Sequence, residues 1–239
     1  MDKTERSADN TPGSTDLAKY ILFGPSWAWS AYDRRDPDPK TEASINYSDI
    51  WGLPYQNLSR PGLSNWQILE LKVIPTIEKN DLPVIWFWSS SIIQGDIKKL
   101  ATADDFFEEY NNIQKSMQEK IVASVGDKKI MIIGAHSDPP TLGWPKNIKI
   151  YPTSCQQRLN TLANTSVPPL EYELLHKYWQ ASQIKPTHFF TNLLYEGLNA
   201  WKKWEKLDYW YEVHPNTNFI NLFGTESKQA VEDFLNERF

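Results

Sequence analysis

The segment YILFGPSW, residues 20–27, determines how the rest of the sequence is interpreted. Its first four residues are apolar, so they predict a short buried strand that ends at Gly24. Pro25 and Ser26 follow at once, which places a serine on the turn that leaves the strand. A serine in that position exposes its hydroxyl above the sheet and directs its own backbone N–H outward. Ser26 is therefore the first candidate for a functional side chain.

Short apolar runs and amphipathic stretches alternate along the rest of the chain, which is typical of a parallel sheet with helices on both faces. The aromatic segment 185–210 fits neither pattern clearly. Thr102 is expected to cap the second predicted helix and Ser227 the last one. The spacing predicts strands over 20–23, 55–58, 83–88, 129–134 and 148–152, helices over 65–78, 104–124, 169–182 and 227–238, and a Pro-rich loop over 31–46.

Length and composition indicate one globular domain over residues 17–239, after a polar lead-in over 1–16 that is expected to be disordered. The lead-in has no apolar core and no later stretch has membrane-spanning length, so we expect a cytoplasmic protein without a membrane partner. The net charge of -5 argues against nucleic acid as a partner. Cys155 is the single cysteine and is expected to be a buried, inert thiol. Nothing in the sequence indicates an oligomeric state.

In an open parallel sheet, ligands bind beyond the carboxyl ends of the strands, so the residues that follow each strand are the ones to inspect. The second strand is followed by NLSRPGLSN, residues 57–65, in which Gly62 permits close approach of the backbone to a ligand. Three serines at 89–91 follow the third strand, and His136 follows the fourth. The triplet His214-Pro215-Asn216 stands just before the last predicted helix.

These motifs, taken in order, resemble the SGNH (GDSL-type) hydrolase family over nearly the whole chain, in a style most similar to members encoded by phages and marine bacteria. The resemblance implies a flavodoxin-like three-layer α/β/α sandwich and a virus-encoded origin. It also implies an enzyme without a cofactor that hydrolyses a small-molecule or carbohydrate ester. Ser26 would be the nucleophile and His214 the general base. The backbone N–H groups of Ser26 and Gly62 would bind the oxyanion, and Asn65 would brace the second loop.

The chain departs from the family pattern in three places. Pro25 replaces the acidic residue that usually precedes the nucleophile. The third motif, which usually supplies an asparagine to the oxyanion, is missing, so a hydroxyl of Ser89 or Ser90 is the expected substitute. The position three residues before His214 is not acidic, which leaves Glu212 or Asp208 as candidate acids, with a Ser–His dyad equally open.

Structural interpretations of the same residues remain open. Ser26 fits a simple helix N-cap, and His214 fits a loop histidine before a helix. Trp27, Asn65 and His136 are expected beside the substrate or behind the catalytic residues. The four scattered histidines have no cysteine partners, so no metal site is expected. The departures from the motifs favour a second hypothesis, in which the fold serves as a weakly active or inactive module that binds a glycan or a protein partner.

Overall fold

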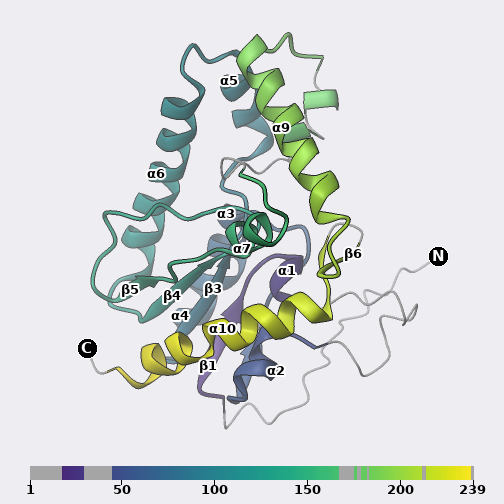
Figure 1. Cartoon of the computed structure of the whole chain (residues 1–239). Helices are drawn as coiled ribbons and strands as arrows, with labels where there is room; N and C mark the ends of the chain where they lie inside the picture. The colour runs from purple at the N-terminus through teal and green to yellow at the C-terminus, as the bar shows by residue number, and fades with distance from the viewer. Residues whose placement is uncertain are drawn as a thin grey trace, which may run out of the picture.

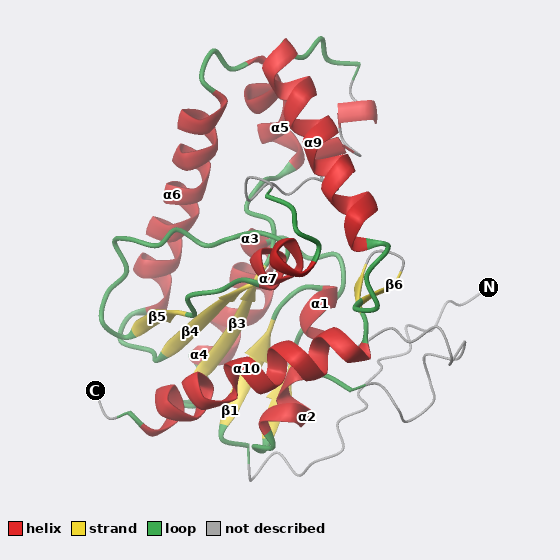
Figure 2. Ribbon diagram, viewed as in Figure 1, coloured by secondary structure: helices red, strands yellow, loops and turns green. Residues whose placement is uncertain are grey.

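A five-stranded parallel sheet forms the centre of the protein (Figures 1 and 2). The computed structural model describes residues 18–29, 45–166, 175–176, 179–181, 183–211 and 214–237. The strands are β1 Tyr20–Phe23, β2 Tyr55–Asn57, β3 Val84–Trp88, β4 Ile130–Gly134 and β5 Ile148–Ile150. They lie in the order β2-β1-β3-β4-β5, with every neighbouring pair parallel. The predicted α/β fold is confirmed, and its topological switch point lies between β1 and β3.

The helices and a small second sheet complete the described chain. The helices are α1 Ser26–Trp29, α2 Tyr47–Trp51, α3 Asn65–Ile68, the π-helical turn η2 Leu69–Val73, α4 Ile74–Ile77, α5 Gln94–Thr102, α6 Phe106–Val125, α7 Cys155–Leu162, α9 His188–Trp204 and α10 Thr217–Asn236. The second sheet pairs β6 Trp210–Tyr211 with β7 His214–Pro215 in antiparallel fashion. The predicted lead-in 1–16, nearly all of the predicted loop 31–46 and most of the predicted helix 169–182 lie outside the described residues.

Helices cover both faces of the sheet because its three central strands, β1, β3 and β4, are buried and apolar on both sides. Successive strand residues point to opposite faces, so β1, β3 and β4 each contribute to two separate apolar clusters. One cluster packs Tyr20, Leu22, Ile85 and Phe87 against α1, α2, α7 and α10. The other packs Ile21, Phe23, Val84, Trp86 and Trp88 against α3, η2, α4 and the C-terminal part of α6. The result is the three-layer sandwich that the family resemblance implied.

A helical extension, formed by α5, the first half of α6 and α9, rises beyond the sheet (Figure 1). It starts from the loop that follows β3, on the side to which the carboxyl ends of the strands point. With 20 residues, α6 is roughly 30 Å long, which is more than the sheet can cover. Its first half therefore packs Phe106, Tyr110 and Ile113 against apolar residues of α5 and α9 in a third cluster. The sequence analysis predicted no helix at α5 and left α9 undecided.

Two predicted helix caps are wrong. Asp105 caps α6, because its carboxylate accepts the Glu108 backbone N–H at 3.0 Å, whereas Thr102 ends the preceding α5. Asn216 caps α10, which begins ten residues before the predicted Ser227. The Ser227 hydroxyl lies inside that helix, where it donates to the Phe223 carbonyl. The helix continues through this serine because its hydroxyl satisfies a carbonyl of its own helix, a common arrangement for a buried serine.

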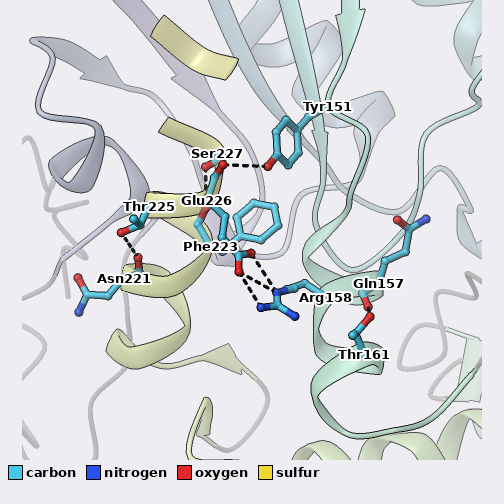
Figure 3. Close-up of polar contacts among 9 residues, drawn as sticks. All are labelled: Tyr151, Gln157, Arg158, Thr161, Asn221, Phe223, Thr225, Glu226 and Ser227. Atoms are coloured by element: carbon cyan, nitrogen blue, oxygen red, sulfur yellow. Dashed lines mark hydrogen bonds and ion pairs between the residues drawn. The ribbon is translucent and has the colours of Figure 1, made fainter. Parts of the chain in front are cut away.

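Polar contacts between α7 and α10 fix the last helix on the sheet (Figure 3). Arg158 of α7 donates from Nη2 to Glu226 Oε1 at 2.6 Å and from Nε to both carboxylate oxygens. The Tyr151 hydroxyl donates to the Glu226 backbone carbonyl at 3.4 Å. Because both charged side chains are partly exposed, this ion pair contributes at most about 1 kcal/mol. The ion pair also fixes the position of α10, which begins three residues after His214.

Gly24 allows α1 to approach the sheet closely. A Cβ at this position would lie 2.5 Å from Ala28 Cβ and 2.8 Å from Phe87 Cβ, and both atoms are held by the core. Gly24→Ala is therefore expected to lower the free energy of unfolding by about 1–3 kcal/mol through overpacking. Urea unfolding of the purified variant measures this change.

Gly95→Ala is the matched control, because a Cβ at Gly95 would meet nothing within 4 Å. Alanine favours a helix over glycine, so the control is expected to unfold at the same urea concentration as the unaltered protein or slightly above it. Equal unfolding midpoints for the two variants would contradict the close approach at Gly24.

Candidate active site

The loops that leave β1, β2, β3 and β4 are joined by backbone hydrogen bonds at one edge of the sheet. The Arg60 N–H donates to the Gly24 carbonyl at 3.0 Å, which links the loop after β2 to the turn before Ser26. The Asn65 N–H donates to the Ser90 carbonyl at 2.7 Å, which links the same loop to the one after β3. These loops therefore form one connected surface at the switch point, where ligands bind in open α/β sheets.

Ser26 and His214 meet on this surface although 188 positions separate them in the chain. His214 Nε2 lies 2.8 Å from Ser26 Oγ, which is hydrogen-bonding distance. Ser26 is the first residue of α1, and His214 stands in β7 just before α10. A serine hydroxyl bonded to an imidazole nitrogen is the arrangement that activates a serine as a nucleophile.

The β6–β7 hairpin and the start of α10 hold His214 in place. In the hairpin His214 pairs with Tyr211. The Asn216 side-chain oxygen accepts hydrogen bonds from two backbone N–H groups of α10. Its Nδ2 donates a hydrogen bond to the Asp208 carbonyl at 3.1 Å. Its backbone N–H donates to the Tyr209 carbonyl. The triplet that the sequence analysis singled out thus contributes a candidate base and, two residues later, the cap that anchors it.

The structure describes one of the two candidate acids, Asp208, and also the carboxylate of Asp138 after β4. Glu212 lies outside the described residues. Asp208 is exposed, and one of its carboxylate oxygens accepts from Asn218 Nδ2 at 3.2 Å at the start of α10. Asp138, which follows β4, accepts from Gln157 Nε2 at 2.9 Å and lies against α7. Burial raises the pKa of Asp138 above its usual range.

Asn65 connects the loops after β2 and β3 from a fully buried position. Its Nδ2 donates to the Ser89 carbonyl at 2.8 Å and to the Ser91 hydroxyl at 2.9 Å. Its Oδ1 accepts the Ser89 N–H at 2.7 Å. The sequence analysis placed Asn65 behind the second loop, and the structure shows that its side chain binds the third. Ser91, whose hydroxyl accepts the hydrogen bond from Asn65 Nδ2, was not among the predicted site residues.

The hydroxyls of Ser89 and Ser90 are both engaged in the backbone of these loops. Ser89 Oγ donates to the Leu63 carbonyl at 2.7 Å, and Ser90 Oγ lies 3.1 Å from the Ile92 carbonyl and accepts the Ile92 N–H. Each hydroxyl has a single proton to donate. As the loops stand, neither proton is directed to a ligand, which differs from the role expected of Ser89 and Ser90. The Ser89 carbonyl also accepts from Ser137, a residue that the sequence analysis passed over.

Gly62 is exposed in the loop after β2. Its φ of +75° lies in the left-handed region, and a Cβ built there would meet nothing within 4 Å. Backbone conformation, rather than lack of space, therefore explains the glycine.

The side chains of Trp27 and His136 pack against each other next to Ser26. Trp27 is almost fully buried, and its ring meets the His136 ring edge-on at a centroid distance of 5.5 Å. Burial, and to a lesser extent the charge of His214, lower the pKa of His136 to about 4. His136 is therefore a neutral imidazole at neutral pH.

Other nucleophile, metal and membrane sites gain no support from the described part of the chain. Cys155 is fully buried as expected, and burial raises the pKa of its thiol to about 12, so the thiol is inert at neutral pH. Within the described ranges, no group of three or more histidine, cysteine or acidic side chains could hold a metal ion. In the same ranges, every helix is too short or too polar to cross a bilayer.

Comparisons with known proteins give a distant likeness only. No family model and no curated protein matches the sequence. A catalytic mutant of an acetylxylan esterase from Geobacillus stearothermophilus is 12% identical with a TM-score of 0.36, over 92% of this chain and 95% of that one. A putative GDSL-like lipase from Parabacteroides merdae is 16% identical with a TM-score of 0.31, over 78% of this chain and 98% of that one.

Proposed function

We propose that this protein is a serine hydrolase that cleaves carboxylic esters, with Ser26 as nucleophile and His214 as general base. The observation that carries the proposal is the 2.8 Å contact between His214 Nε2 and Ser26 Oγ. A helix N-cap alone would not explain why a histidine from the other end of the described chain is brought to this hydroxyl. Position adds support, because the pair lies at the switch point of the sheet.

The reaction proceeds in two halves. Ser26 Oγ attacks the carbonyl carbon of the ester while His214 Nε2 takes the hydroxyl proton, and the carbonyl oxygen becomes an oxyanion. His214 then gives this proton to the leaving oxygen as its bond to carbon breaks, which releases an alcohol and leaves acyl-Ser26. Water, deprotonated by His214, attacks the acyl group and releases the acid, and the proton returns to Ser26.

Backbone N–H groups stabilise the oxyanion in this proposal. Ser26 opens α1, and the first N–H groups of a helix have no partner within it. Gly62 supplies the second N–H from its open loop. The family resemblance and the exposed loops favour an acetyl or acyl ester of a carbohydrate-like or other small molecule as substrate.

Labelling with a fluorophosphonate, followed by intact mass measurement, tests this proposal. The unaltered protein is expected to gain a single adduct, because the probe reacts with an activated serine. Ser26→Ala is expected to gain none. As a matched control, Ser124→Ala removes a hydroxyl from α6 and is expected to label like the unaltered protein. If the folded, unaltered protein gains no adduct, the result would contradict the hydrolase proposal and favour the hypothesis of a binding module.

A further inference from the structure

His136 is a polar side chain of this surface that the proposed reaction does not use. It follows β4, and its ring lies edge-on against Trp27, the residue directly after Ser26. His214 lies close enough for its charge to act on the His136 ring. His136 therefore lies beside both members of the Ser26–His214 pair without belonging to it.

The two ring nitrogens of His136 differ in their surroundings. Nδ1 is enclosed, and among the described residues it has no hydrogen-bond partner. The residue as a whole is partly exposed, and Nε2 is not among the enclosed, unpartnered atoms of the described residues. Orphaned N–H groups are rarer in folded proteins than under-satisfied acceptors. The neutral ring is thus expected to keep only a lone pair on Nδ1 and to carry its proton on Nε2.

The position of His136 indicates which part of a bound ester its side chain would contact. In the proposed reaction His214 returns the proton to the leaving oxygen, so the leaving group departs on the His214 side of Ser26. The His136 ring lies against Trp27 and is near enough to His214 to be affected by its charge, whereas the proposed oxyanion donors come from Ser26 itself and from the loop after β2. A hydrogen bond from His136 would therefore reach the leaving group rather than the oxyanion.

We propose that the Nε2–H of His136 donates a hydrogen bond to the leaving oxygen of the ester and thereby favours esters of weakly acidic alcohols, such as sugar hydroxyls. This inference rests on the proposed function. His136 keeps its proton throughout, while His214 delivers the proton that ends on the alcohol. The bond is most valuable for a poor leaving group, whose oxygen carries the most charge as the carbon–oxygen bond breaks. An activated aryl leaving group needs it little.

A matched pair of variants tests this role. His136→Phe keeps a ring against Trp27 but has no N–H, whereas His136→Gln places an amide N–H near the position of Nε2. For ethyl acetate, His136→Phe is expected to lower kcat/KM by about tenfold, the value of one hydrogen bond made in the transition state. For p-nitrophenyl acetate we expect a loss below about threefold. His136→Gln should restore most of the ethyl acetate activity.

The outcomes separate this inference from the proposed function. Equal losses for both esters, or a glutamine variant as slow as the phenylalanine variant, would overturn the role of His136 and leave the serine hydrolase intact. Absence of a fluorophosphonate adduct on the unaltered protein would overturn both. Imidazole ¹⁵N spectra of the unaltered protein give a test that needs no variant. A neutral ring protonated on Nε2 at neutral pH supports the inference, and a ring that is charged or protonated on Nδ1 overturns it.

Discussion

His214→Ala is expected to reduce the turnover of p-nitrophenyl acetate by about 10⁴- to 10⁶-fold, and Ser26→Ala by a similar factor. The reason is the 2.8 Å contact between the two side chains, which makes them act as a unit. Without Ser26, His214 has no hydroxyl proton to take. Without His214, Ser26 has no base to accept its proton. The double variant is therefore expected to be no slower than the slower single variant, within about threefold. Steady-state kinetics on the three proteins measures this coupling.

His188→Ala is the matched histidine control for this series. His188 is exposed at the start of α9 and contacts Asn192 within the same helix, so its loss is expected to leave turnover unchanged. If the effects of the two single substitutions multiply in the double variant, the two residues act independently. That result would contradict the assigned roles even if each single variant were slow.

Asn65→Ala is expected to lower the free energy of unfolding by about 2–4 kcal/mol, and the melting temperature by about 5–15 °C. The substitution leaves the Ser89 N–H without its acceptor and the Ser91 hydroxyl without its donor. Both groups are buried, so water cannot fully replace the amide. Calorimetry measures the change. Ester turnover should fall as well, because the loop that carries Gly62 loses three of its hydrogen bonds with the loop after β3.

Asn65→Asp separates the two hydrogen-bonding functions of this side chain. Aspartate keeps an acceptor for the Ser89 N–H but has no N–H for the Ser89 carbonyl, and it buries a carboxylate. It should therefore be at least as unstable as the alanine variant. Asn111→Ala, on the exposed side of α6, is the control and should melt within about 2 °C of the unaltered protein. A similar melting temperature for Asn65→Ala would show that the network contributes little to stability.

Much of the fold was predictable from the sequence because the strands are apolar on both faces. Runs such as residues 20–23 and 83–88 have few structural alternatives to a buried strand, and the structure places β1 and β3 there. The errors concern helices whose packing is not local. The pattern of α5 and α9 makes sense only when each helix is paired with α6 in the third apolar cluster. The early start of α10 was missed because Ser227 has the chemistry of a cap, although it lies in mid-helix.

The positions of candidate site residues were predictable where one residue follows one strand, as for Ser26 and His136. It was not predictable where loops exchange hydrogen bonds. A serine in a run of three gives no sign of which hydroxyl will face a ligand, and the outcome depends on where the Leu63 and Ile92 carbonyls come to lie. The contacts of Asn65 with Ser89 and Ser91 require the loops after β2 and β3 to be adjacent, which the order of the sheet decides.

The distance in sequence between Ser26 and His214 has a consequence for synthesis. Ser26 follows the first strand of the described chain, and His214 lies in the last strand, 188 positions later. A chain still on the ribosome carries the serine long before the histidine emerges, and a fragment cut ahead of α10 would lack a stably anchored base. Contacts at such long range also form late, since a large loop must close first. Reactivity at Ser26 would therefore appear only in molecules that have been completed and correctly folded.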